Sequence, residues 1–351
     1  MRVAIADVQV PFIAGGGEAL ARGLLHACRR AGHEAELVTM PFRFSPDSEV
    51  SRHMTSWEAE HFDNFNGYTP EIVVCLRFPA YCLRHQRKVV WLLHQHRAFY
   101  ELWDPAAPEN TPERNAVRQY VIQKDTAHLA ASERVYTISK NVTDRARRYN
   151  GVSSTPLYHP PPMAGKLYCA DPEAYIFAPS RLESLKRQWL LIEAMRHVRA
   201  PVVVLISGAG GQEPRYRQLI EQFGLSDRIR LVGKLSEDEM ASYYACSLGV
   251  FFGPFDEDYG YITLEAMLSG KPVITCTDSG GPLEFVRDHE TGLVVEPTPE
   301  AVAEAVEFLY ADRQRAADLG AAGYARCQAL QLCWESVVSE LIRPYSITSA
   351  T

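Results

Sequence analysis

The 351-residue sequence lacks several features that mark common protein classes. Its 8 cysteines include no C-x-x-C pair, which excludes zinc-ribbon sites and thioredoxin-like redox sites. No apolar run reaches the ~18 residues that a membrane-spanning helix needs. The first residues form no apolar segment of the kind found in signal peptides, and Asp7 interrupts them early. We therefore expect a cytoplasmic protein whose cysteines are reduced and mostly buried.

A strong charge of one sign is also absent, because the formal net charge is −7. Residues 1–165 carry 19 Lys and Arg against 17 Asp and Glu, a net charge of +2, and the remainder carries 17 against 26, a net charge of −9. Nucleic-acid-binding proteins usually have a basic domain or face, so no nucleic-acid partner is expected. The basic run at 84–88 allows peripheral contact with the anionic inner face of a membrane, although a solvated connection is the simpler interpretation.

Two series of short apolar runs alternate with helical patterns. The first series lies at 2–6, 34–38, 71–76, 88–93 and 134–138, and the second at 175–179, 201–207, 229–232, 248–252, 272–276 and 292–295. Helices are predicted at 17–31, 117–131, 186–197, 212–223, 236–245 and 300–309. Strands that are apolar nearly throughout suit parallel sheets covered on both faces. The alternation predicts an α/β protein with two Rossmann-like, doubly wound parallel-sheet domains.

A stiff connector marks the domain boundary, because Pro160, Pro161 and Pro162 fix the backbone. We predict domains at 1–162 and 163–330. The sequence also predicts a C-terminal helix within 331–351, for which packing on either domain is open, including a return to the first. No element is assigned to 41–70 or 98–116. Three predicted helix N-caps and one helix-ending glycine support the helix assignments; these residues are Ser139, Ser236, Thr298 and Gly270.

Two features of the first half suggest binding. Gly15, Gly16 and Gly17 precede the first predicted helix, where free N–H groups can bind an anion, although a plain tight turn explains them equally well. The spacing is not G-x-G-x-x-G, which disfavours a nicotinamide dinucleotide. His94 and His96 end the fourth predicted strand, but no third ligand has suitable spacing, so no metal site is expected. A structural role for both histidines stays open.

The second half places charged residues after its predicted strands. Arg181 and Lys186 follow the first strand of this series and can hold a diphosphate, although a solvated helix start explains the pair alone. Gly208 follows the next strand, at the edge where open α/β sheets bind ligands. Glu257 lies in a loop after a buried strand, and Glu265 lies in the following helix, where its carboxylate can accept hydrogen bonds from a ribose diol.

These residues resemble those of retaining glycosyltransferase family 4. Glu257 and Glu265 match its E-x7-E signature, and the segments 259–260, 265–267, 270–274 and 291–294 are similar to it. The specific resemblance covers about 175–297, whereas the first half is similar mainly in layout. It implies the GT-B fold, with two facing Rossmann-like domains that bind the acceptor and the donor, respectively.

The resemblance also implies a set of residue roles. Catalysis would involve His94, Glu257, Arg181 and Lys186. The binding roles would be donor diphosphate for Gly16, Arg181, Lys186, Gly208, Gly260 and Tyr261; donor ribose for Glu265; donor sugar for His94, Glu257, Asp258, Tyr259 and Gly260; nucleobase for Gly233, Lys234 and Leu235; and acceptor for Gly15, Gly17, His96 and Arg97.

The implied reaction transfers a sugar from a nucleoside-diphosphate sugar to a hydroxyl of a glycan, polysaccharide or lipid-linked acceptor. It would retain the anomeric configuration and need neither a metal nor another cofactor, and donor frequency in the family favours a UDP-sugar over a GDP-sugar. The alternatives are a dehydrogenase, a pyridoxal-dependent phosphorylase, and a non-catalytic nucleotide-sugar-binding or partner subunit. The sequence does not separate the last of these from an enzyme.

Overall fold

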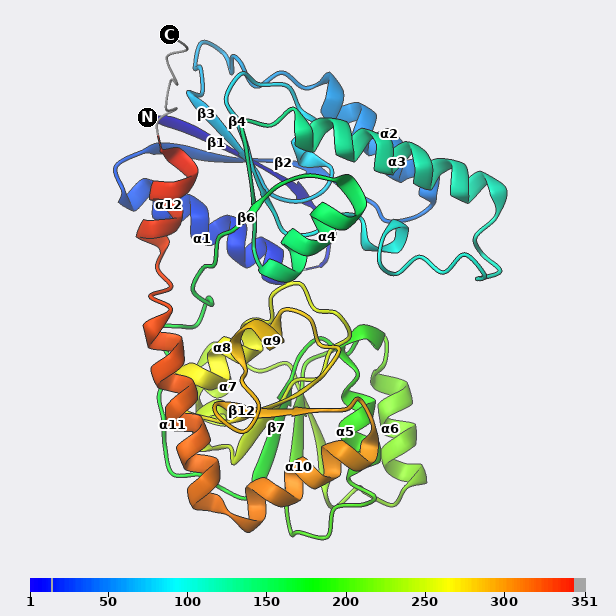
Figure 1. Ribbon diagram of the computed structural model, residues 1–351, viewed down its shortest axis with the longest axis vertical. Helices are drawn as coiled ribbons and strands as arrows, with labels where there is room; N and C mark the ends of the chain where they lie inside the picture. The colour runs from blue at the N-terminus through cyan, green and yellow to red at the C-terminus, as the bar shows by residue number, and fades with distance from the viewer. Residues whose placement is uncertain (14, 344–351) are drawn as a thin grey trace. The chain divides into compact units, whose positions relative to one another are not determined.

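A computed structural model describes residues 1–13 and 15–343, and the last residues of the predicted C-terminal segment lie outside this range. The chain divides into two compact units (Figure 1). The first unit contains residues 1–159 together with residues 333–343, and the second contains residues 160–332. Each unit is built around its own sheet, so each is described separately.

The first unit contains a six-stranded sheet in the order β2-β1-β3-β4-β5-β6. Every neighbouring pair of strands is parallel. The strands are β1 (Arg2–Gln9), β2 (Glu34–Pro41), β3 (Ile72–Cys75), β4 (Lys88–Leu92), β5 (Arg134–Thr137) and β6 (Thr155–Pro156). Strands β3 and β4 are buried along their whole length, as their largely apolar sequences predict.

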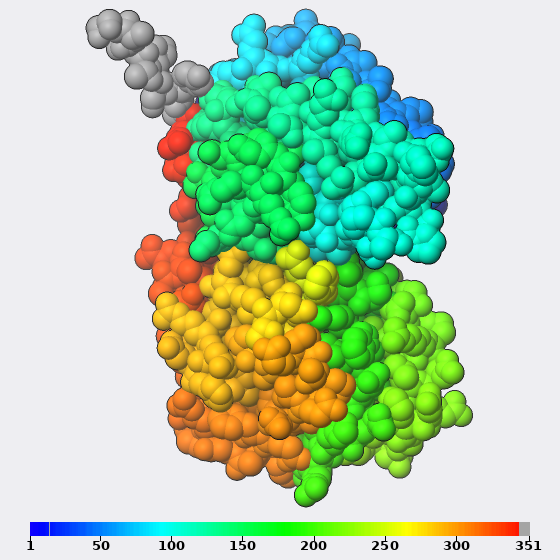
Figure 2. All heavy atoms as spheres, turned by 45° about the vertical axis from the view of Figure 1, so that its right-hand side comes forward, coloured from blue at the N-terminus to red at the C-terminus, as the bar shows by residue number. Residues whose placement is uncertain are grey.

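The helices of the first unit cover this sheet. They are α1 (Gly16–Arg30), α2 (Asp47–Ala59), α3 (Pro112–Ala130), α4 (Lys140–Asn150) and α12 (Trp334–Ile342), with short 3-10 turns η1 (Ala80–Cys82) and η2 (Arg97–Phe99). Helices α3 and α4 lie side by side on its surface (Figure 2). Helix α12 packs on α1, where a Cβ added at Gly23 would lie 2.3 Å from the Trp334 ring.

The second unit repeats the plan with the strand order β12-β11-β10-β7-β8-β9, again with every pair parallel. Its strands are β7 (Tyr175–Pro179), β8 (Val203–Ser207), β9 (Ile229–Gly233), β10 (Gly249–Phe251), β11 (Val273–Cys276) and β12 (Gly292–Val295). The predicted pair of doubly wound parallel sheets is therefore confirmed. The predicted runs do not include β6 (Thr155–Pro156), because a strand of two residues has no periodic sequence pattern.

The helices of the second unit alternate with these strands. They are α5 (Gln188–Ala194), α6 (Glu213–Gln222), α7 (Glu237–Cys246), α8 (Tyr261–Leu268), α9 (Pro282–Phe285), α10 (Pro299–Ala311) and α11 (Arg313–Ala329), and the 3-10 turn η3 (Ser184–Lys186) precedes α5. The large core of this unit forms between its strands and helices α5, α6, α10 and α11. Among residues 1–13 and 15–343, no helix is both long and apolar enough to cross a bilayer.

The three helix N-caps and the helix-ending glycine that the sequence predicts are all present. The hydroxyls of Ser139, Ser236 and Thr298 each accept a hydrogen bond from a backbone N–H in the first turn of the following helix. Gly270 has a φ of +64° just beyond α8, as expected for a residue that ends a helix. The unassigned stretch 41–70 contains α2, whose weak amphipathic pattern gave no clear period in the sequence.

Helix α3 carries a buried carboxyl group in the first unit. Asp125 on α3 is fully buried, and its Oδ2 accepts a hydrogen bond of 2.7 Å from the Tyr100 hydroxyl. Asn150 donates to the same hydroxyl and to Thr126. Burial raises the pKa of Asp125 from 3.8 to about 7, because the charged form loses its hydration.

This raised pKa makes stability depend on pH in a defined direction. Between about pH 4 and pH 7 the unfolded Asp125 is ionised while the folded one keeps its proton, so the free energy of unfolding falls as pH rises, by about 1.4 kcal/mol per unit. The substitution Asp125→Asn removes this contribution. Urea unfolding across this range should show a difference between variant and wild type that grows with pH and levels off above pH 7. Parallel curves would contradict the assignment, and the exposed Asp144→Asn is the control.

Candidate functional site

Five loops of the second unit leave the same edge of its sheet. They follow β7, β8, β9, β10 and β11, and the order β11-β10-β7-β8-β9 makes them neighbours. Because the carboxyl ends of parallel strands meet at one edge, Arg181, Lys186, Gly208, Gly233 and Glu257 gather there. The edge therefore combines two cations, a carboxylate and glycine turns in one place.

The Lys186 ammonium and the Glu257 carboxylate form an ion pair across two of these loops. Their Nζ and Oε2 atoms are 2.5 Å apart, and both side chains are largely buried. The ammonium also lies 5.6 Å from the centre of the Phe252 ring. The backbone supports the carboxylate, since Glu257 N donates to Ser279 O and its carbonyl accepts from Gly281 N. The pair can present a positive and a negative charge to one polar ligand.

Arg187 organises these loops, and the sequence reasoning missed it. Its guanidinium makes a bidentate ion pair with Asp278, at 2.8 and 2.6 Å, and donates to the carbonyls of Gly253 and Pro254. Arg187 itself has a φ of +51°, which turns the chain between η3 and α5. It ties the loop containing Lys186 to those after β10 and β11. Its sequence position beside Lys186 gave no sign of this partner.

Close backbone packing explains two of the glycines. Gly208 has a φ of +126°, and a Cβ there would lie 1.8 Å from the carbonyl oxygen of Ser180. Gly260 has a φ of +91° at the start of α8, where a Cβ would lie 2.9 Å from Pro282. Both positions need glycine, because a side chain has no room and the backbone is left-handed. The glycine turns thus set the backbone of the loops after β8 and β10.

Glu265 lies on α8 in a different environment from Glu257. It is 7% exposed, and its Oε2 accepts a hydrogen bond of 2.8 Å from the Tyr244 hydroxyl. Burial raises the pKa of Glu265 to about 7. Burial also raises the pKa of Tyr261, and the nearby Glu265 carboxylate adds to that effect. Tyr259 is buried against Phe285 and packs edge-on against Tyr261. Glu265 is therefore a buried hydrogen-bonding group rather than a surface charge.

The remaining predicted donor residues lie on the rim of this edge. Arg181 follows β7 and is exposed, and within residues 1–13 and 15–343 its guanidinium forms no ion pair. Gly233 ends β9 with a φ of +72°, and its carbonyl accepts from Gly208 N at 2.8 Å. Lys234 and Leu235 follow it, and Lys234 is exposed. Asp258 is half-buried in the loop after β10.

The backbone at the glycine turn of the first unit is hydrogen-bonded to a side chain of the protein itself. The backbone N–H of Gly15 donates to the Glu18 carboxylate at 2.8 Å, at the N-terminus of α1. Arg77 forms an ion pair with that carboxylate and a bidentate pair with Asp7, at 2.8 and 2.7 Å. A Cβ at Gly17 would lie 3.0 Å from Arg77, whereas Gly16 begins the helix. Sequence reasoning missed Arg77, whose partners are far away in the chain.

The three predicted site residues that follow β4, which are His94, His96 and Arg97, have different surroundings. His94 is half-buried, and its Nδ1 donates a hydrogen bond of 2.6 Å to the Gln95 carbonyl. His96 is buried among aromatic rings, including Phe78 and Phe99, and burial lowers its pKa to about 4. Arg97 pairs with a buried glutamate, Glu101. No group of three metal-ligating side chains is found in the part of the chain that the structure describes.

The fold of the chain is shared with other solved structures. Sucrose-phosphate synthase from Thermosynechococcus elongatus superimposes with a TM-score of 0.76 over 97% of both chains, at 20% sequence identity. HepE from Anabaena, solved in complex with UDP-glucose, gives a TM-score of 0.69 over 97% of this chain and 98% of that one, at 17% identity. The two parallel six-stranded sheets thus form the GT-B fold.

Sequence similarity is concentrated in the second unit. Residues 166–326 match the family model for glycosyl transferases group 1. A GDP-mannose-dependent alpha-(1-6)-phosphatidylinositol monomannoside mannosyltransferase from Mycobacterium tuberculosis is 34% identical over 174 residues, 46% of this chain and 44% of that protein. A D-inositol 3-phosphate glycosyltransferase from Corynebacterium urealyticum is 31% identical over 177 residues, 47% and 41% of the two chains. The chain thus aligns with less than half the length of these relatives.

The packing at Gly208 predicts that alanine substitutions at two glycines of the same loop will have very different effects on stability. Gly208→Ala should lower the free energy of unfolding by at least about 2 kcal/mol, because the new Cβ meets Ser180 O and the backbone is left-handed. Gly211→Ala should change it by less than about 0.5 kcal/mol, since nothing lies within 4 Å of a Cβ there. Thermal unfolding of both variants tests this difference. Equal stabilities would show that the loop after β8 is not packed as described.

Proposed function

We propose that this protein is a retaining glycosyltransferase of family 4 that transfers a sugar from a nucleoside-diphosphate sugar to an acceptor hydroxyl. The observation that carries the proposal is the shared edge of the second sheet, where Arg181, the pair of Lys186 with Glu257, and Glu265 follow neighbouring strands. The match of residues 166–326 to glycosyl transferases group 1 supports it. A donor with a diphosphate, a ribose and a sugar fits cations, a buried carboxyl group and a polar loop.

The proposed chemistry depends on stabilising the leaving group. As the bond between the anomeric carbon and the diphosphate oxygen breaks, negative charge grows on the diphosphate, and Arg181 and Lys186 would neutralise it. The acceptor oxygen would form the new bond on the same face of the sugar, and its proton would pass to the departing phosphate. Glu257 would orient the sugar, and Glu265 would accept hydrogen bonds from the ribose hydroxyls. This scheme uses no metal or other cofactor.

The roles of the first unit remain predictions. We propose that it binds the acceptor, a glycan, polysaccharide or lipid-linked glycan, through the region of Gly15, Gly17, His96 and Arg97, and that Gly16 assists the diphosphate. His94 would contact the donor sugar through its Nε2. The burial of His96 and the ion pair of Arg97 favour supporting roles for these two residues. Peripheral association with the inner membrane face is proposed for a lipid-linked acceptor only.

The donor is proposed to be a UDP-sugar, with a GDP-sugar as the competing choice. HepE, a fold neighbour, was solved with UDP-glucose, whereas the mannosyltransferase relative uses GDP-mannose by name. Gly233, Lys234 and Leu235 are proposed to contact the base, and Gly208, Gly260 and Tyr261 the diphosphate. A binding experiment with both nucleotides therefore separates the two donors.

A thermal-shift measurement tests the ribose assignment. A ligand present at 100 times its Kd raises the free energy of unfolding by about 2.7 kcal/mol, so UDP or GDP should raise the unfolding temperature by several degrees. Glu265→Gln should weaken that nucleotide at least about tenfold, because one of the two carboxylate acceptors is lost. Glu304→Gln, at an exposed position on α10, is the control and should respond like wild type. Equal responses of all three proteins would contradict the assignment of Glu265.

Turnover tests the diphosphate assignment. Lys186→Ala and Arg181→Ala should each lower nucleoside-diphosphate release from the preferred donor by about 10²-fold or more, because each removes a charge that stabilises the leaving group. Release is measured with UDP-glucose and GDP-mannose, with water and a panel of glycans as acceptors, and Lys166→Ala is the control. Near wild-type rates in both variants would refute these roles. Nucleotide binding without release in the wild type would indicate the non-catalytic alternative.

A further inference from the structure

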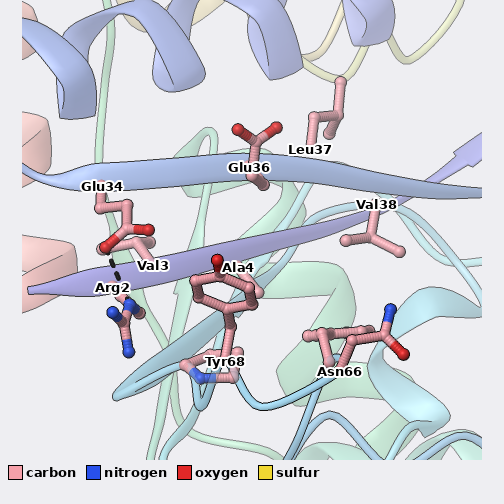
Figure 3. A pocket seen from close by; sticks show the side chains of 11 residues that line it. Arg2, Val3, Ala4, Glu34, Glu36, Leu37, Val38, Asn66 and Tyr68 are labelled. Carbon is pink, nitrogen blue, oxygen red and sulfur yellow. Dashed lines mark hydrogen bonds and ion pairs between the residues drawn. The ribbon is translucent and has the colours of Figure 1, made fainter.

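A cavity of about 570 Å³ opens in the first unit at the start of its strands, away from the loops described above. Its floor is the edge of the sheet at β1 and β2, where Arg2 pairs in register with Glu34 and Ala4 with Glu36. Its outer wall is the loop that contains Asn66 and Tyr68 (Figure 3). Five residues separate Ala4 from the carboxyl end of β1, about 16 Å along the strand. The cavity is thus separate from the glycine turn.

A rigid turn holds the wall of the cavity. Phe65 and Tyr68 exchange two backbone hydrogen bonds, at 2.7 and 2.9 Å, and Asn66 and Gly67 between them both have positive φ. An Asn-Gly pair in this conformation is a favoured two-residue turn. The Phe65 ring packs on Phe62, which packs on Trp57 of α2. The turn is therefore anchored to the core of the unit, and it presents Tyr68 in a defined position.

The cavity combines an exposed ring with polar groups on either side. Tyr68 is 58% exposed, and Figure 3 shows its ring rising toward β1, with Arg2 on one side and Asn66 on the other. Ala4 and Val38 supply small apolar surface above it. Apolar lining with a few convergent polar groups is typical of small-molecule sites, and the volume falls within their usual range.

The charges around the cavity are already balanced. Arg2 Nε lies 2.8 Å from Glu34 Oε2, and its guanidinium carbon lies 5.2 Å from the centre of the Tyr68 ring. Glu36 pairs with Arg29 of α1 at 2.9 Å. Each carboxylate keeps oxygen lone pairs that can accept from hydroxyls, and Asn66 can both donate and accept. This arrangement favours a ligand that is neutral and rich in hydroxyl groups.

We propose that this cavity is a saccharide-binding site that holds one or two rings of a neutral glycan. The apolar face of a sugar ring would stack on Tyr68, and its hydroxyls would bond to Glu34, Asn66 and Arg2. The choice of a glycan rests on the proposed function, because a glycosyltransferase that extends a glycan benefits from holding it at a second point. The cavity, its ring and its charge balance stand independently of that function.

Other ligand classes fit less well. The nearby carboxylates repel a phosphate, and Arg2 already occupies the cation position over the Tyr68 ring. A peptide strand could pair with the outer edge of β2, but exposed Glu34 and Glu36 and the terminal Pro41 are features that protect edge strands from such pairing. A neutral saccharide needs no new charge partner and no strand pairing.

Calorimetric titration with neutral oligosaccharides of glucose, mannose, galactose and N-acetylglucosamine tests the proposal on the full chain. At least one should bind the wild type, and Tyr68→Ala should weaken that binding at least fivefold. Tyr68→Phe should keep most of the affinity, because it keeps the ring. Tyr168→Ala removes a tyrosine of similar exposure, 49%, in the second unit and should bind like wild type. Thermal unfolding of each variant checks that it is folded.

The same samples separate this proposal from the proposed function. A nucleotide thermal shift that is unchanged in Tyr68→Ala, together with the loss of saccharide binding, supports both proposals. Saccharide binding that depends on Tyr68 without any nucleotide response supports the cavity alone and contradicts the donor site. A nucleotide response without saccharide binding, or with binding that is equal in Tyr68→Ala, overturns the saccharide site. Binding of a β-strand peptide that Tyr68→Ala abolishes, with no saccharide binding, also overturns it.

Discussion

The parallel pairing of β7 with β10 is the constraint on which the candidate site depends. Gly249 and Val250 lie in register with Ile176 and Phe177, so both strands end at the same edge of the sheet. The loops that follow then lie within reach of each other, and the Lys186–Glu257 ion pair joins residues 71 apart in the chain. An antiparallel arrangement would send the two loops to opposite edges. Strand direction therefore brings the charges together.

Glu257 and Glu265 are eight residues apart, yet their carboxyl groups lie in environments that give them different charge and hydrogen-bonding partners. Glu257 lies in a loop and is paired with an ammonium, whereas Glu265 lies on a buried helix and accepts from a tyrosine hydroxyl. Burial raises the pKa of Glu265 to about 7, because the charged form loses its hydration. The difference suits one residue to orienting a polar ligand beside a cation, and the other to holding a diol.

The two units use the same architecture differently. At the carboxyl edge of the first sheet, the glycine turn is bound by Glu18, which Arg77 and Asp7 hold in place. The helix N-terminus therefore already has an anionic partner, whereas the loops of the second unit present the exposed guanidinium of Arg181. The first unit offers its cavity at the other end of its strands, beside the turn at Asn66. The exposed cation and the sequence similarity thus both lie in the second unit.

The sequence by itself determined the two series of strands, most helices, three N-caps and the residues that follow each strand of the second unit, because these depend on short-range periodicity and local hydrogen bonding. It missed α2, whose amphipathic signal is weak, and it left the surroundings of His96 open. Only the tertiary structure decided the partners of Arg187 and Arg77, since ion pairs between distant segments follow from strand order, not from spacing. The cavity beside Tyr68 likewise exists only where β1, β2 and a distant turn come together, and no local pattern encodes that meeting.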